Sequence, residues 1–157
     1  MQIKDIMQTK VVSVRRALSL TKLLGLFREF HSFPFIPVVD GNNTLIGVVH
    51  IRGFFDIFKP YHENILMRNP LSLVAQEDTD IFDVDIEEGM GSLIIVADIM
   101  DKKVVKIEEN QDLKEAYELI QLNKCEMIAV VDAENKLTGI ISMFDIVMAV
   151  SKEKGLI

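Results

Sequence analysis

The sequence predicts an α/β (α+β) protein built from two copies of one β-α-β-β-α unit. The stretch IKDIMQTKVVSV (3–14) returns as VADIMDKKVVKI (96–107), and IPVVDGNNTLIGVV (36–49) returns as IAVVDAENKLTGII (128–141). Self-similarity of this kind indicates two units of the same structure. We therefore divide the chain into three parts, namely a first repeat at 1–58, a connection at 59–95 and a second repeat at 96–157.

The first strand and first helix of each unit have clear signals. The apolar stretches VVSV (11–14) and VVKI (104–107) predict short strands. A helix follows in each repeat, because apolar residues recur at the three- and four-residue spacing of one helix face. Ser19 and Asp112 precede these helices as N-caps, and Asp112 with Glu115 makes a capping-box pattern.

The second part of each unit reads as a hairpin followed by a helix. FIPVVD (35–40) and IAVVD (128–132) run into turn residues, and a further apolar strand follows directly. Two strands separated by so short a turn predict an antiparallel pair. Each repeat then ends in a predicted helix, at about 51–58 and at 143–152.

The connection at 59–95 has no counterpart in the repeat. Between Glu77 and Glu88 it carries seven acidic residues and no Lys or Arg. FDVDIE (82–87) alternates apolar and acidic residues, which favours an extended strand. The acidic stretch lacks the ligand spacing and the glycine of an EF-hand loop, so we expect a solvated acidic edge rather than a calcium site.

Composition and charge exclude several classes of protein. The net charge is −7, and the acidic stretch accounts for it, which argues against non-specific binding of nucleic acid. No apolar run approaches the ~20 residues that span a membrane, and the N-terminus has no secretory signal. Cys125 is the single cysteine, which is typical of a reducing compartment. We expect a cytoplasmic protein that binds neither nucleic acid nor membrane.

The two units resemble a tandem pair of CBS domains, the Bateman module. The resemblance rests on DIM (5–7 and 98–100), on the two strands that end in VVD, and on GIISMFDI (139–146). It implies two units packed sheet to sheet with pseudo-twofold symmetry, leaving two equivalent clefts. It also implies that a cleft holds an adenine-containing ligand.

GIISMFDI carries the residues that the resemblance assigns to the ligand. It implies that Ser142 approaches a phosphate and that Asp145 accepts hydrogen bonds from the ribose hydroxyls. An ionised carboxylate can accept from both hydroxyls of a ribose, and a serine hydroxyl can donate to a phosphate oxygen. The same two residues are also ordinary caps for the last helix. The two roles are compatible, and the sequence leaves both open.

The first repeat is expected to complete the pocket around Asp145. The resemblance places the adenine between apolar residues at the first and second strands, with one polar side chain nearby. The candidates are Thr9, Val11, Val12, Phe33, Pro34 and Phe35. For the two valines and Phe35, plain core packing is the alternative.

The first repeat departs from the pattern at its own cleft. His50 stands where Ser142 would be, Arg52 replaces Phe144, and Gly53 replaces Asp145. Glycine has no side chain to hold a ribose, so this cleft is predicted to be degenerate. His50 and Arg52 remain possible phosphate contacts, or they are solvated residues at a helix start. Gly53→Asp is expected to allow weak binding at this second site.

The leading functional hypothesis is a regulatory module that binds an adenosyl ligand between its repeats and signals to a partner that the sequence does not identify. The ligand classes are AMP, ADP, ATP and S-adenosylmethionine, and no cofactor is required. A homodimer through the helices is expected. The alternative is a structural, dimerising module with no nucleotide. An enzyme is disfavoured, because the three histidines are not spaced as metal ligands and no P-loop occurs.

Overall fold

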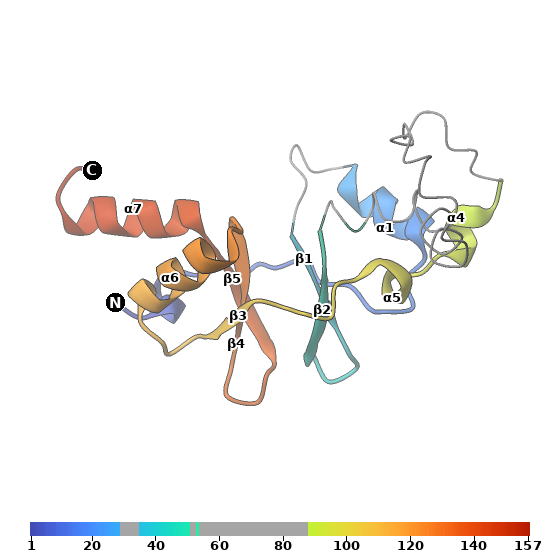
Figure 1. The fold of residues 1–157 in the computed structure, drawn as a ribbon, viewed down its shortest axis with the longest axis horizontal. Helices are drawn as coiled ribbons and strands as arrows, with labels where there is room; N and C mark the ends of the chain where they lie inside the picture. The colour runs from blue at the N-terminus through green and yellow to red at the C-terminus, as the bar shows by residue number, and fades with distance from the viewer. Residues whose placement is uncertain (29–34, 51–52, 54–87) are drawn as a thin grey trace, which may run out of the picture.

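The computed structural model describes residues 1–28, 35–50, 53 and 88–157, and it arranges them as two halves (Figure 1). Along the long axis, helices α6 and α7 come first, followed by the sheet β3–β5, the sheet β1–β2, and helices α1, α4 and α5. The chain therefore forms two sheets facing each other, with helices on both outer sides. Within the described residues, no helix is both long and apolar enough to cross a bilayer.

The second half has the predicted β-α-β-β-α order, with β3 parallel to β4 and β4 antiparallel to β5. Its elements are β3 (Lys106–Glu108), α6 (Leu113–Asn123), β4 (Met127–Val131), β5 (Leu137–Ser142) and α7 (Met143–Glu153). Asp112 caps α6 as expected, accepting a hydrogen bond from the Lys114 amide at 2.9 Å.

The first half repeats the helix and the hairpin but not the first strand. Its elements are α1 (Leu20–Phe27), β1 (Ile36–Val39) and β2 (Leu45–Val49). The prediction of a strand at 11–14 was wrong, since only Val14 pairs with β1, as an isolated parallel bridge to Val38. The predicted strand at 104–107 likewise begins only at Lys106. Both stretches first carry the chain from one half to the other, so their early residues have no neighbouring strand.

Two predictions fall mainly outside the described residues. Of the predicted helix at 51–58 only Gly53 is described, and the predicted strand at 82–87 lies outside as well. The connection is described from Glu88 onward. There α4 (Met90–Leu93) packs against α1, and α5 (Val96–Ile99) opens the second repeat.

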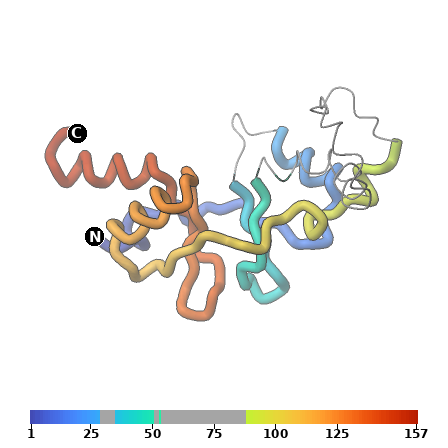
Figure 2. Tube along the Cα trace, in the orientation of Figure 1, coloured from blue at the N-terminus to red at the C-terminus, as the bar shows by residue number. Residues whose placement is uncertain are grey.

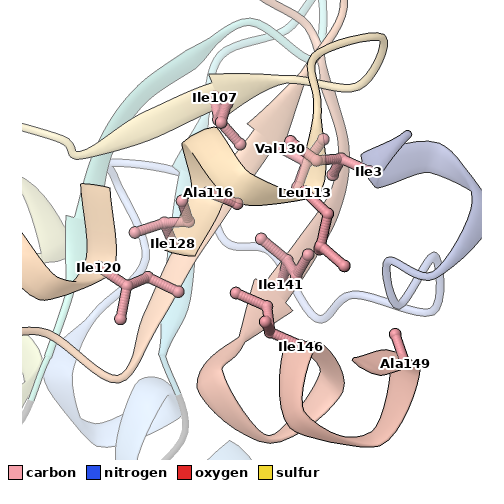
Figure 3. Close-up of a cluster of buried hydrophobic side chains, with 10 residues drawn as sticks. All are labelled: Ile3, Ile107, Leu113, Ala116, Ile120, Ile128, Val130, Ile141, Ile146 and Ala149. Atoms are coloured by element: carbon pink, nitrogen blue, oxygen red, sulfur yellow. The ribbon is translucent and has the colours of Figure 1, made fainter. Parts of the chain in front are cut away.

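Each repeat gives its opening segment to the core of the other half. Ile3, in the short helix η1 (Ile3–Asp5), is fully buried among side chains of α6, α7 and the β3–β5 sheet (Figure 3). Val96 and Ile99 in α5 are buried in the same way among residues of α1, β1 and β2. The tube of Figure 2 shows both crossings, in blue for the N-terminal segment and in yellow for the second. The halves are thus interlocked rather than merely adjacent.

The two hairpin turns meet across the interface between the sheets. The Asn43 side chain donates to the Leu137 carbonyl at 2.9 Å, and the Asn135 side chain donates to the Leu45 carbonyl at 3.2 Å. The Leu45 and Leu137 amides donate back to the asparagine carbonyls, each at 3.0 Å. Both asparagines have positive φ (63° and 64°), a conformation that asparagine tolerates better than most residues. The hydrogen bonds between the two turns therefore follow the pseudo-twofold symmetry of the two halves.

Glycines allow the crossing segments to lie directly on the strands. A Cβ on Gly139 would stand 2.8 Å from both the Gln8 carbonyl oxygen and the Met7 sulfur. A Cβ on Gly47 would stand 2.9 Å from the Met100 sulfur. Such contacts are far below van der Waals separation, so each strand needs a glycine where the other repeat's methionine packs. This explains why a glycine and a DIM motif occur together in both repeats.

Replacing Asn43 or Asn135 by glycine should lower the free energy of unfolding by about 0.5–1.5 kcal/mol each, the usual net value of one hydrogen bond. Glycine keeps the positive φ and removes the side-chain donor, and at position 135 it also removes the acceptor of a hydrogen bond from Lys106 Nζ. Urea denaturation measures the loss. Asn42→Gly is the control, because it adds a glycine to the same turn and leaves both bonds between the halves in place. If Asn42→Gly lowers the free energy of unfolding by the same amount, the side-chain bonds of Asn43 and Asn135 do not explain the loss.

Gly139→Ala should lower the free energy of unfolding by roughly 1–3 kcal/mol, the usual cost of overpacking. Gly25→Ala is the matched control. Gly25 lies within α1, and a Cβ added there would meet no neighbouring heavy atom within 4 Å, so alanine should stabilise the protein by about 0.5–1 kcal/mol. Opposite signs in parallel urea titrations are expected. A Gly139→Ala protein as stable as the natural one would contradict the close approach.

Candidate functional site

Ser142 and Asp145 meet at the junction of β5 and α7. Ser142 is the last residue of the strand and the N-cap of the helix, and Asp145 lies in the first turn. The Asp145 amide donates to Ser142 Oγ at 3.2 Å, while Asp145 Oδ2 accepts from the Ser142 amide at 2.8 Å and from its hydroxyl at 2.6 Å. Ser142 and Asp145 therefore cap α7, as the alternative interpretation of the sequence predicts. It holds the carboxylate in a fixed place, which a ligand role also needs.

The second oxygen of Asp145 points to a residue that the sequence analysis missed. Gln8 Nε2 lies 3.1 Å from Asp145 Oδ1 and 3.1 Å from Oδ2. Gln8 is held there by its main chain, which exchanges hydrogen bonds with Ile140 at 2.9 and 3.0 Å. The sequence offers one signal for this position, because Gln8 and Asp101 both follow a DIM motif and are therefore equivalent in the two repeats.

The segment after Gln8 carries three of the predicted pocket residues from one half to the other. It starts on β5 of the second half, and it reaches β1 of the first half at Val14. Thr9 and Val12 are exposed on this crossing and Val11 is half-buried. The structure thus places these three candidates between the halves, on the same segment as the Asp145 contact.

The remaining pocket candidates divide into two groups. Phe35 is half-buried and packs against Leu45, Ala129 and Val131 in the small apolar cluster between the two sheets. Core packing therefore accounts for Phe35 at least in part. Phe33, Pro34 and Arg52 lie outside the described residues, as does any contact that they make.

The first half has different chemistry at the equivalent place. His50 follows β2, and its Nε2 lies 3.7 Å from a carboxylate oxygen of Asp101, the counterpart of Gln8. A Cβ on Gly53 would stand 2.6 Å from the Ile99 carbonyl oxygen. The expectation that Gly53→Asp would restore a site is therefore corrected, because an aspartate there would force the backbone apart. The glycine at position 53 lets the chain lie close to the last residue of α5.

Three further features of the described part of the chain bear on its chemistry, namely possible metal-binding groups, the Cys125 thiol and a surface groove. No group of three or more His, Cys, Asp or Glu residues there is placed to hold a metal ion. Burial raises the pKa of the Cys125 thiol above its ordinary value, which disfavours the nucleophilic thiolate. A groove of about 550 Å³ lies between α6 and α7, and it is lined mainly by apolar side chains. Neither Ser142 nor Asp145 lines it.

Relatives include proteins of the same size and much longer ones. The chain is 28% identical over 156 residues to protein MJ1426 of Methanocaldococcus jannaschii, covering 95% of this chain and 90% of that protein. It is 44% identical over 118 residues to inosine-5'-monophosphate dehydrogenase of the same organism, which is 75% of this chain and only 17% of that enzyme. The second relationship therefore concerns a small part of the enzyme.

Solved structures share the arrangement of both halves. CBSX2 in complex with AMP superposes with a TM-score of 0.69 and 22% identity over 98% of each chain. The CBS domain pair of MJ0100, in complex with 5-methylthioadenosine and S-adenosyl-L-methionine, gives 0.65 and 13%, again over 98% of each chain. At these identities the likeness establishes the fold.

The match to a family model covers the two repeats and leaves out most of the connection. The model is that of the CBS domain, and it matches residues 3–59 and 96–152. These ranges span more than half of the chain. The chain is therefore a member of the CBS domain family, carrying two such domains in tandem.

Proposed function

We propose that this protein is a regulatory module that binds an adenosyl ligand, such as AMP, ADP, ATP or S-adenosylmethionine, at Asp145 between its two halves. The observation that carries the proposal is the placement of Asp145. Its carboxylate is held by Ser142 at the start of α7, and it faces the segment that crosses between the halves. Solved CBS pairs of the same fold hold AMP or S-adenosyl-L-methionine.

The residues around Asp145 suit the parts of such a ligand. Asp145 accepts hydrogen bonds from the two ribose hydroxyls, since one ionised carboxylate matches two adjacent donors. To donate to a phosphate, the Ser142 hydroxyl would turn away from Asp145 Oδ2, and the dipole of α7 would add to its effect. Thr9, Val11 and Val12 follow the Gln8 contact and line the adenine side. Regulation would then come from ligand contacts that bridge the halves, and the regulated protein is a further partner.

Asp145→Ala should weaken AMP binding by roughly 1.5–3 kcal/mol, the scale of hydrogen bonds to a charged group. It should also lower the free energy of unfolding by only ~1 kcal/mol, the cost of a lost cap. Calorimetric titration with AMP measures the first effect and urea denaturation the second.

The matched control for this test is Glu115→Ala. Glu115 occupies the same capping position in α6, where its carboxylate accepts from the Asp112 amide at 3.3 Å. This variant should lose a similar amount of stability and bind AMP as the natural protein does. If folded Asp145→Ala also binds AMP unchanged, the assignment of the site is wrong.

A structural module without nucleotide is the second candidate function. His50, Asp101 and Gly53 favour it for the first half, because that half offers no carboxylate in the place of Asp145. Failure of the natural protein to bind any adenosyl compound at millimolar concentration would favour this function for the whole chain.

We also propose a homodimer formed through α6 and α7. The groove between these helices is lined by Tyr117, Ile146 and Val147, and the apolar side chains of Phe144 and Val147 are 68% and 52% exposed. A second copy that covered this face would remove the exposed apolar area from water. We place this dimer in the cytoplasm because a single cysteine is typical of proteins in a reducing compartment.

Val147→Glu should convert the dimer to a monomer, because a buried unpaired charge at an interface is costly. Light scattering at micromolar concentration should give twice the 17.8 kDa of one chain for the natural protein and 17.8 kDa for the variant. Lys152→Glu, also on α7, is the control for added negative charge. A natural protein that scatters as 17.8 kDa contradicts the dimer.

A further inference from the structure

The hydrogen bonds of Asp145 are divided unequally between its two oxygens. Oδ2 accepts from the Ser142 amide, from the Ser142 hydroxyl and from Gln8 Nε2. Oδ1 accepts from Gln8 Nε2, the one bond to this oxygen within the described residues. A carboxylate oxygen has two good acceptor positions, and Ser142 alone fills those of Oδ2. An incoming donor can therefore be accepted mainly by Oδ1, the oxygen to which Gln8 also donates.

Gln8 is well placed to occupy these acceptors and to leave them. Its main chain is fixed on Ile140, and the glycine at 139 lets it lie directly against the strand. Its side chain is exposed, and the Asp145 side chain is only half-buried, so both can be reached from solvent. A long, exposed side chain can turn to another rotamer without disturbing the backbone that carries it.

The other half shows that this pairing is not an automatic result of the fold. Asp101 occupies the position of Gln8 and pairs with His50, while Gly53 takes the place of Asp145. An aspartate at position 101 is an acceptor without an amide donor. The donor at 8 and the carboxylate at 145 thus occur together, in the same half.

We infer that Gln8 is a competing latch on the Asp145 carboxylate, which a ligand must displace when it donates two ribose hydroxyls to that carboxylate. This inference rests on the proposed function and adds to it a residue that sets affinity. The Gln8 amide and a ribose hydroxyl are donors of the same kind directed at the same oxygens. The latch therefore lowers the affinity for ligands with a ribose and leaves unchanged those that bind without Asp145.

The test is a double-mutant cycle in AMP binding, measured by calorimetry on the full chain. Gln8→Ala should bind AMP about three- to tenfold more tightly, because the ligand no longer breaks a solvent-exposed hydrogen bond, whose net value is that of a typical hydrogen bond. In the Asp145→Ala background, Gln8→Ala should change the affinity less than twofold. Gln121→Ala, an exposed glutamine on α6, is the control and should leave AMP affinity unchanged.

A ligand-free measurement separates the latch from the proposed function. The side-chain amide signals of Gln8 in a nitrogen-15 NMR spectrum should shift in Asp145→Ala, whereas those of Gln121 should not. If the Gln8 signals do not shift, or if Gln8→Ala binds AMP equally or more weakly while the natural protein binds it, the latch is overturned and the proposed function stands. If neither the natural protein nor Gln8→Ala binds AMP or S-adenosylmethionine, both are overturned.

Discussion

The close approach of each crossing segment to the opposite half's last strand is the constraint on which the rest of the structure depends. Main-chain hydrogen bonds join Gln8 to Ile140 and Asp101 to Val48, and glycines at 47 and 139 provide the necessary space. The same contacts bury Ile3 and Val96 in the partner core. Each core therefore includes side chains from the opening segment of the other repeat. Stability and the geometry between the halves therefore arise from one set of contacts.

This shared framework carries different chemistry in its two halves. The backbone places position 8 beside position 145 in one half, and position 101 beside position 50 in the other. One half thereby gains a carboxylate with an amide opposite it, and the other gains a histidine–carboxylate pair. Pseudo-symmetry fixes where these positions lie, and single substitutions decide which polar groups meet there. Under the proposed function, the half with Asp145 would bind the ligand and the other half would be structural.

Much of the fold could be predicted because the repeat supplied every element twice. The caps Ser19 and Asp112, the hairpins, and the placement of Ser142 and Asp145 at the start of α7 follow from local patterns. The strand at 11–14 was wrong because valine content does not reveal whether a neighbouring strand is present. Gln8 was missed because its role depends on a contact with a residue more than a hundred positions away. The obstacle at Gly53 was hidden for the same reason, since it lies in the carbonyl of Ile99.

The central claim is that Asp145 holds the ribose of an adenosyl ligand between the two halves. A crystal structure of the protein grown with AMP tests it most directly. The account predicts ribose hydroxyls within hydrogen-bonding distance of the Asp145 carboxylate, the Gln8 side chain turned away from it, and the base beside Val11 and Val12. AMP bound elsewhere, with the bonds from Gln8 to Asp145 intact, would contradict the account.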